Sequence, residues 1–195
     1  ANGDIYHFGF VWLFILAQAT QTSTGIMKIA ITGPESSGKT TLANALASHY
    51  DVAVIPEYAR EFLEENGSEY EYSQGDLDGI AEGHEENLQI FSTEKSRINI
   101  VDTDFVVLKV WSEHKYDFAS TYINELVSEN HFDLHVLCAP DIPWEADPLR
   151  ENPDDRHILF EKYISVLNAF KKDFIIVNGA LEGRLKKSIQ VIDQL

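Results

Sequence analysis

The sequence predicts an α/β fold of three layers, in which helices cover both faces of a mostly parallel, five-stranded sheet. Three observations predict it. Short apolar runs alternate with longer segments of helical character along most of the chain. A glycine-rich turn joins the first apolar run to the first helical segment. The length of 195 residues suits one such domain and is too short for two with linkers.

The expected strands are short runs of apolar residues, and most end at a polar residue or at proline. They lie at 29–31, 52–55, 98–101, 134–138 and 174–177. Pro56 closes the second run and forces the residue before it out of helical geometry. The strand at 98–101 runs directly into Asp102. Ligands of such sheets gather at the carboxyl ends of the strands, so the residues that follow each run are the candidates for a site.

The expected helices fill the intervals between the strands. They lie at 41–47, 57–66, 73 to about 95, 105–114, 118–130, 155–170 and from 181 onward. The first carries Leu42, Ala45 and Leu46 on one stripe, Gly67 stops the second, and Ser73 is a plausible N-cap for the third. Glycines in the third helix weaken its first turns and allow a neighbour to approach closely.

Residues 1–26 differ from the rest of the chain. They contain no Lys or Arg, a single acid at Asp4, and an apolar stretch at 8–17, about half of what a membrane-spanning helix requires. The basic start of a signal peptide is missing, and the sole methionine is Met27. We expect the folded domain at 27–195, with 1–26 outside it. An added tail, an upstream extension of the reading frame and the end of a fused membrane protein remain open, and membrane contact is expected only if the leader is native.

Charge and cysteine content restrict the partners. The formal net charge is −17 and no cluster of Lys and Arg occurs, which argues against nucleic acid as a partner and favours a neutral or cationic small molecule. Cys138 is the only cysteine, so the chain forms no internal disulfide, and its apolar run predicts a buried thiol. A reducing cytoplasm is the expected location. The oligomeric state is not predicted.

The turn after the first strand matches G-x-x-x-x-G-K-[ST], the phosphate-binding Walker A motif, in the strand–turn–helix context that this motif requires. Its glycines let backbone N–H groups face phosphate oxygens, and the helix N-terminus that follows favours an anion. Lys39 is expected to reach the β- and γ-phosphates, and Thr40 to hold Mg²⁺. The expected nucleotide-binding residues are Gly33, Glu35, Ser36, Ser37, Gly38, Lys39, Thr40 and Thr41. ATP with Mg²⁺ is the expected cofactor pair.

Carboxylates follow two of the expected strands. Asp102 ends the strand at 98–101, where a phosphate-loop protein places the group that orients the metal, so we expect Asp102 and Thr40 to form the metal site. Asp104 is either a second functional carboxylate or the N-cap of the next helix. Glu57 either serves as base or sugar ligand, or merely favours the dipole of its helix. Arg60 lies on that helix and could simply pair with Glu64.

A polar, proline-broken segment at 141–156 follows the strand at 134–138. Loops of this length in compact domains are usually functional or disordered. Trp144, Arg150 and Arg156 favour a lid whose arginines neutralise a transferring phosphoryl group and whose closure excludes water, and a plain surface loop is the alternative.

Five sequence blocks together resemble the ribosylnicotinamide kinase domain of the NadR family, a P-loop nucleoside kinase, here without companion domains. The blocks are 33–42 (GPESSGKTTL), 56–61 (PEYARE), 80–84 (IAEGH), 101–105 (VDTDF) and 143–147 (PWEAD) with Arg150 and Arg156. The resemblance covers most of 27–195 and implies a nucleoside-kinase fold with a mobile lid. It implies transfer of phosphate from ATP to the 5′-hydroxyl of nicotinamide riboside, giving nicotinamide mononucleotide, a step of NAD salvage.

The expected site combines these blocks with the chemistry of the substrate. The catalytic group is Lys39, Asp102, Asp104, Glu57, Arg150 and Arg156, with one of the three carboxylates taking the hydroxyl proton. The substrate-binding group is Glu57, Tyr58, Arg60, Asp104, Trp144 and Asp147, in which Tyr58 and Trp144 could stack on the pyridinium cation. Two alternatives stay open, namely a kinase for another nucleoside or nucleotide, and a non-catalytic ATP-binding switch or regulatory ATPase.

Overall fold

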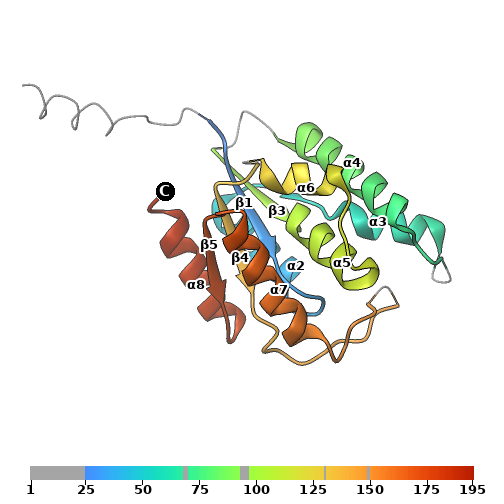
Figure 1. The fold of residues 1–195 in the computed structure, drawn as a ribbon. Coiled ribbons are helices and arrows are strands. Elements are labelled where there is room, and N and C mark those ends of the chain that lie inside the picture. The colour runs from blue at the N-terminus through green and yellow to red at the C-terminus, as the bar shows by residue number, and fades with distance from the viewer. Residues whose placement is uncertain (1–24, 68–69, 93–96, 130, 149) are drawn as a thin grey trace, which may run out of the picture.

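The computed structural model describes residues 25–67, 70–92, 97–129, 131–148 and 150–195. Five strands form one sheet, and every pair of neighbours is parallel. The sheet order is β2-β3-β1-β4-β5 (Figure 1). The strands are β1 (Met27–Thr32), β2 (Val54–Ile55), β3 (Ile98–Asp102), β4 (Leu134–Cys138) and β5 (Phe174–Val177).

Helices connect the strands and cover both faces of the sheet. They are α2 (Lys39–Tyr50), α3 (Tyr58–Asn66), α4 (Gln74–Phe91), α5 (Phe105–Tyr116), α6 (Thr121–Ser128), α7 (Arg156–Ala169) and α8 (Leu181–Ile192). α2 and α8 pack together on one face, and α3 to α7 pack on the other. The fold is therefore the three-layer α/β architecture that the alternating pattern predicted.

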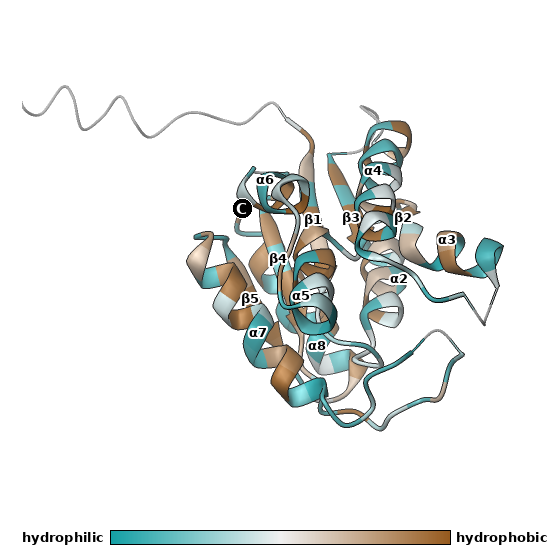
Figure 2. Cartoon of the chain, turned by 45° about the vertical axis from the view of Figure 1, so that its right-hand side comes forward, coloured by the Kyte–Doolittle hydropathy of each residue, from teal (hydrophilic) through white to brown (hydrophobic). Residues whose placement is uncertain are grey.

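Each face of the sheet has its own apolar core, because successive side chains of a strand point to opposite faces. On β3, Ile100 packs with α2 and α8, whereas Val101 packs with the larger helical layer. Val136 and Leu137 divide in the same way on β4. In Figure 2 brown residues recur along these central strands, and the helices around them carry both brown and teal residues. Strands buried on both faces read as continuous apolar runs, which is why they were recognisable in the sequence.

The direction of the sheet order reverses beside β1, which lies between β3 and β4. In open parallel sheets this switch point, at the carboxyl ends of the strands, is where ligands bind. The phosphate loop follows β1, Glu57 follows β2, Asp102 ends β3, and the segment 139–155 follows β4. The fold thus brings four separate stretches of sequence to one edge of the sheet (Figure 1).

Element boundaries differ from expectation mainly at helix ends. Ser73 caps α4 in a full capping box with Asp76, but α4 ends at Phe91, and residue 95 lies outside the described part of the chain. Helix α6 is shorter than expected, because Ser120 rather than Phe118 begins it: the Ser120 side chain accepts a bond from Ile123 N. The expected end of that helix at residue 130 also lies outside the described residues.

Residues 1–24 lie outside the described part of the chain, so the expectation that the folded domain begins at Met27 remains a prediction. β1 begins at Met27. Among the described residues, none of the helices combines the length and apolar character needed to cross a membrane.

Candidate active site

The phosphate loop has the backbone geometry that its glycines permit. Gly33 has φ of 135° and Gly38 has φ of 82°, conformations that residues with a Cβ rarely adopt. A Cβ at Gly33 would lie 2.7 Å from the carbonyl oxygen of Cys138 on β4, so the loop and the neighbouring strand approach too closely for any side chain. Gly38 is also the N-cap of α2, which directs the helix N-terminus into the loop.

Lys39 and Thr40 are the first two residues of α2, directly after this loop, and both line a pocket. The Lys39 ammonium donates to the Pro34 carbonyl oxygen at 3.1 Å, which directs it across the loop. The Thr40 hydroxyl lies near the carboxylate of Asp102. Burial raises the pKa of this carboxyl, and the Thr40 hydroxyl and the Lys39 charge partly oppose the rise. Asp102 is 4% exposed, and its Oδ1 has no hydrogen-bond partner among the described residues.

Thr40 and Asp102 suit a magnesium ion. Mg²⁺ takes oxygen ligands and usually keeps several waters, so that one hydroxyl and one carboxylate are a sufficient protein contribution. A buried carboxylate oxygen without a partner carries a free-energy penalty, which a cation relieves. The donor set and the unpartnered Oδ1 therefore fit the metal site expected from the sequence.

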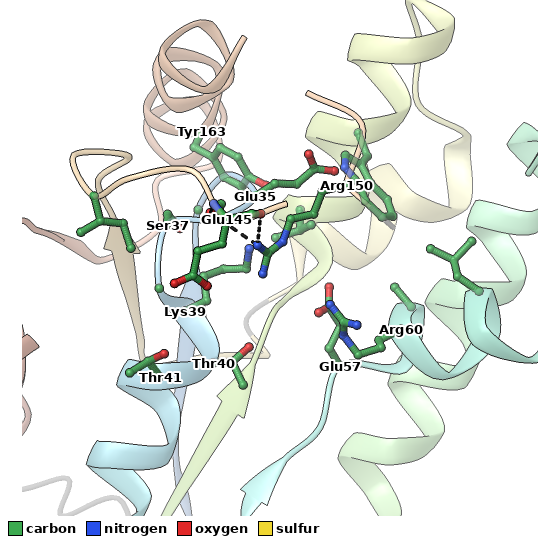
Figure 3. A pocket seen from close by; sticks show the side chains of 18 residues that line it. Glu35, Ser37, Lys39, Thr40, Thr41, Glu57, Arg60, Glu145, Arg150 and Tyr163 are labelled. Carbon is green, nitrogen blue, oxygen red and sulfur yellow. Dashed lines mark hydrogen bonds between the residues drawn. The ribbon is translucent and has the colours of Figure 1, made fainter. Parts of the chain in front are cut away.

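The pocket continues from the phosphate loop to a second wall built by helices on the other face of the sheet (Figure 3). Glu57 and Arg60 lie across from Thr40 in this view. Apolar side chains complete the wall, and the lid segment and α7 close the remaining sides. The lining residues outside the phosphate loop are Glu57, Ala59, Arg60, Leu63, Val107, Trp111, Ile142, Glu145, Arg150 and Tyr163. We call this second wall, from Glu57 to Trp111, the acceptor half.

Glu57 occupies the N-cap position of α3 and lines the acceptor half. Desolvation raises the pKa of its carboxyl, and the nearby Asp102 charge adds to the effect. The charges of Lys39 and Arg60 and the nearby Thr103 side chain oppose it. The pKa of Tyr163, which is 2% exposed, is also raised well above its usual value, first by burial and then by nearby carboxylates. A carboxylate with a raised pKa is a better proton acceptor near neutral pH.

The lid segment 139–155 is attached directly to the phosphate loop. Glu35 Oε2 accepts the backbone N–H groups of Glu151 and Asn152, at 3.1 and 3.0 Å. The Ser36 hydroxyl accepts the backbone N–H of Glu145 at 2.9 Å. Side chains of the phosphate loop thus hold two separate points of the lid, which ties the position of the lid to that of the loop.

The two arginines expected in the lid have different positions, because Arg150 lies in the lid segment and Arg156 is the first residue of α7. Arg150 lines the pocket, and its guanidinium donates to the Glu145 carbonyl oxygen at 2.5 Å (Figure 3). Arg156 donates to the carbonyl oxygens of Ser36 and Ile142, at 3.2 and 3.0 Å, and braces the lid against the loop. Of the pair, Arg150 is therefore the one found among the described residues that line the pocket.

Arg60 and Asp147 connect the lid to α3. The Arg60 guanidinium lies 3.1 Å from Asp147 and 3.3 Å from Glu64. The pair with Glu64 is the one that the helical spacing suggested, but the contact with the lid is additional. Arg60 lines the pocket, whereas Asp147 contacts Arg60 and is not among the described lining residues.

Two aromatic residues expected to bind substrate lie outside the pocket lining. The Tyr58 ring packs on Gly83 of α4 so closely that a Cβ there would be 2.1 Å from the ring. The glycine-rich helix does therefore admit a close neighbour, and that neighbour is Tyr58. Trp144 stands beside the Arg156 guanidinium, 5.6 Å from the ring centroid, within the lid. The described lining residues include Trp111 instead.

Asp104 has the structural role that was its alternative interpretation. Its Oδ1 caps α5 by accepting Val107 N at 3.0 Å, and it also accepts the Thr32 hydroxyl at 2.9 Å. Its Oδ2 lies 3.4 Å from His135 Nε2. Asp104 is 0% exposed and is not among the described residues that line the pocket. Burial raises the pKa of Asp104 and lowers that of His135.

Sequence reasoning missed several residues of the site region, among them Trp111, Tyr163 and Arg184. Trp111 and Tyr163 line the pocket from long helices and belong to no motif. Arg184 of α8 is 3% exposed, pairs with Asp141, and donates to the Ser37 carbonyl oxygen at 2.6 Å, so it supports the phosphate loop from behind. The spacing of Arg184, Ser188 and Ile192, at intervals of four residues, could have indicated that Arg184 lies on the buried side of α8.

Comparison with known proteins agrees with this architecture. The profile of a family described as AAA domain matches residues 28–184. The trifunctional NAD biosynthesis/regulator protein NadR of Salmonella typhimurium is 28% identical over 175 residues, and that of Escherichia coli is 32% identical over 175 residues. Both alignments cover 87% of this chain and 43% of the relative, so the chain spans less than half the length of these proteins.

Solved structures give the same picture for the fold. A crystal structure of NadR in complex with NR has a TM-score of 0.68 at 20% identity, covering 87% of this chain and 51% of that one. NadR in complex with NAD and AMP-PNP has a TM-score of 0.70 at 21% identity, with 87% and 49% covered. Thymidylate kinase from Ehrlichia chaffeensis reaches 0.62 at 15% identity, with 87% and 99% covered. The chain thus has the fold of P-loop nucleoside and nucleotide kinases.

Proposed function

The chain belongs to the AAA-domain family and is homologous to the ribosylnicotinamide kinase domain of NadR, and from this premise we propose that it phosphorylates nicotinamide riboside. In this reaction the riboside 5′-hydroxyl oxygen bonds to the γ-phosphorus of ATP, the bond to the β-phosphate oxygen breaks, and nicotinamide mononucleotide and ADP are released. The observation that carries the proposal is one pocket that joins the phosphate loop to a wall carrying Glu57, with Arg150 of the lid in the same lining.

The phosphate half of the pocket binds and orients ATP. Backbone N–H groups of the loop and the N-terminus of α2 face the phosphates, and Lys39 neutralises the β- and γ-phosphates. Arg150 supports the charge on the transferring group from the lid side. When bound, magnesium on Thr40 and Asp102 supplies further neutralisation of phosphate charge. The lid excludes water that would otherwise hydrolyse ATP.

Glu57 is the proton acceptor that we propose for the riboside hydroxyl. It faces the pocket, its pKa is raised by burial, and Lys39 and Asp102 lie close enough to influence it. Asp102 is the less suitable base, because it is not among the described residues that line the pocket, and a metal ion bound to it would counteract the rise in pKa that burial causes. Asp104 caps α5 and is not among the described residues that line the pocket, so we assign it no step in the reaction.

The charge of the acceptor half favours a nucleoside over a nucleotide. An acceptor phosphate would need its own cations, but the guanidinium in this wall belongs to Arg60, which is paired with Glu64 and Asp147. Glu57 adds negative charge to the same wall. A pyridinium ring carries a positive charge and gains from these carboxylates. The second candidate is phosphorylation of another nucleoside, which the fold shared with deoxyadenosine kinase from M. mycoides favours, at a TM-score of 0.57.

A substrate panel tests the proposal. Purified protein is supplied with ATP and magnesium, ADP release is followed by a coupled assay, and product is identified by mass spectrometry. The panel contains nicotinamide riboside, adenosine, deoxyadenosine, cytidine and thymidine, with thymidine monophosphate as the nucleotide. Selective formation of nicotinamide mononucleotide supports the proposal. Turnover with a neutral nucleoside alone favours the second candidate, and slow hydrolysis that no acceptor stimulates favours an ATP-driven switch.

A further inference from the structure

Trp111 is the aromatic residue that the structure, rather than any motif, brings to the acceptor half. It lies on α5 one turn after Val107, and both residues line the pocket. Ala59 and Leu63 of α3 complete this apolar surface. The wall is therefore apolar around Trp111, with the Glu57 carboxylate in the same pocket.

The orientation of the Trp111 ring is fixed from behind. It is stacked on Tyr72, with ring centroids 5.7 Å apart and planes 20° from parallel. Tyr72 is 7% exposed, and its hydroxyl donates to Glu151 Oε2 at 2.8 Å. The Lys115 ammonium lies 3.5 Å from the Tyr72 ring centroid and 3.5 Å from Glu151 Oε1. An aromatic side chain with this support loses little freedom when a ligand stacks on it.

The same contacts connect Trp111 to the phosphate loop. Glu151 holds Tyr72 through its side chain, and its backbone N–H donates to Glu35 of the loop at 3.1 Å. A short chain of contacts therefore runs from Trp111 through Tyr72 and Glu151 to Glu35. The stacking surface and the lid attachment depend on the same residue, Glu151.

We propose that Trp111 is the ring-binding surface of the acceptor site, selecting a planar, cationic heteroaromatic ring by stacking and cation–π attraction. The inference rests on the proposed function, because it assigns the contact that distinguishes a pyridinium riboside from neutral nucleosides. A desolvated cation–π contact with Trp contributes on the order of tenfold or more in affinity. Trp144 and Tyr58, which the sequence suggested for this role, pack against Arg156 and Gly83 instead.

Fluorescence tests the position of the ring. Replacing Trp12 and Trp144 with Phe leaves Trp111 as the only tryptophan of the three in the chain. This protein is saturated with the ATP analogue AMP-PNP and magnesium and is then titrated with nicotinamide riboside. Stacking of a pyridinium on the indole quenches its emission, so a saturable quench is expected. Binding by calorimetry without any change in emission overturns the assignment.

Calorimetry tests the energetic contribution. Trp111→Leu is expected to raise the Kd of nicotinamide riboside about tenfold and to change the Kd of neutral nucleosides less than threefold. Trp111→Phe, which keeps a ring and much of the packing on Tyr72, is expected to lose about threefold, and both variants keep the Kd of AMP-PNP. Trp144→Leu is the matched comparison, and a larger loss there than at Trp111 overturns the inference.

The two proposals fail in different ways. If the unaltered protein binds AMP-PNP but not nicotinamide riboside, the proposed function is wrong and the ring assignment falls with it. If it binds the riboside and Trp111→Leu binds it equally well, with an unchanged melting temperature, only the assignment of Trp111 is wrong.

Discussion

The two halves of the pocket are built in opposite ways. The phosphate half is one contiguous stretch, 33–41, that presents mainly backbone groups and is held in place by the neighbouring strand and by Arg184. The acceptor half is assembled from side chains of α3 and α5, with the lid and α7 beside it. The phosphate half suits the triphosphate group, which all nucleoside triphosphates share. The acceptor half can differ between enzymes that act on different acceptors. Phosphate recognition therefore depends on one local stretch of sequence, whereas the choice of acceptor depends on how several elements pack together.

The largest effect is expected in the phosphate half. Lys39→Ala removes the ammonium that neutralises the β- and γ-phosphates, and we expect turnover to fall at least a hundredfold, or about 3 kcal/mol in the barrier. Steady-state kinetics with ATP and nicotinamide riboside measures it. Lys186→Ala, an exposed change on α8, is the control for charge. Near-normal turnover in a folded Lys39→Ala protein would refute the phosphate-loop assignment.

Glu57→Gln tests the chemistry of the acceptor half. The amide keeps the shape of the side chain but cannot take the hydroxyl proton, so we expect kcat to fall by between tenfold and a hundredfold. Because the pKa of Glu57 is raised by burial and by Asp102, kcat of the unaltered protein should fall as the pH drops through that raised value. The variant should lack this acidic limb.

The matched control for this change is Glu61→Gln, an exposed carboxylate one turn further along α3. It should keep both the rate and the acidic limb. An acidic limb that persists unchanged in Glu57→Gln would assign the proton acceptor to another group, with Asp102 the next candidate.

The sequence predicted the two halves unequally, for a physical reason. A contiguous loop between a strand and a helix is legible from spacing, and the strands were legible because burial on both faces makes them apolar throughout. The acceptor half depends on packing between helices that are distant in sequence. Gly83 signalled a close approach, but only the packing shows that Tyr58 makes it and is thereby drawn away from the pocket. Trp111 carries no local signal at all.

Individual carboxylates show the same limit. Asp104 follows Asp102 by two residues, and the spacing allowed either a catalytic role or a helix cap. Spacing does not give the direction of the side chain, which in the structure caps α5 and lies beside His135. Glu35 matched only a variable position of the loop motif, yet it holds the lid through two backbone N–H groups. Such contacts join residues more than a hundred positions apart, beyond the reach of any periodicity.

Glu35→Ala weakens the connection between the halves. Loss of the two bonds to Glu151 and Asn152 should let the lid open more often, lowering riboside phosphorylation about tenfold and raising ATP hydrolysis that yields no nucleotide product. The ratio of ADP to nicotinamide mononucleotide measures the uncoupling. Glu182→Gln, exposed on α8, is the control. A variant with unchanged coupling would show that Glu35 is not needed to keep the lid closed.

The smallest effect on activity is expected from a change at His84, which tests how the stability of the folded chain depends on pH. His84 lies in α4, behind the acceptor half, and burial together with the His131 charge lowers its pKa to about 4, although its bond to the Thr103 backbone opposes this. His84 therefore takes up a proton near pH 6.5 in the unfolded chain but only near pH 4 in the folded chain. The free energy of unfolding falls as the pH drops through this window. Between pH 7.5 and pH 5 the loss is about 2 kcal/mol from this residue. His84→Gln should remove that part of the slope in urea unfolding while leaving turnover at pH 7.5 within about twofold. An equally steep slope in the variant would assign the acid sensitivity to His131 and His135, whose pKa values burial also lowers.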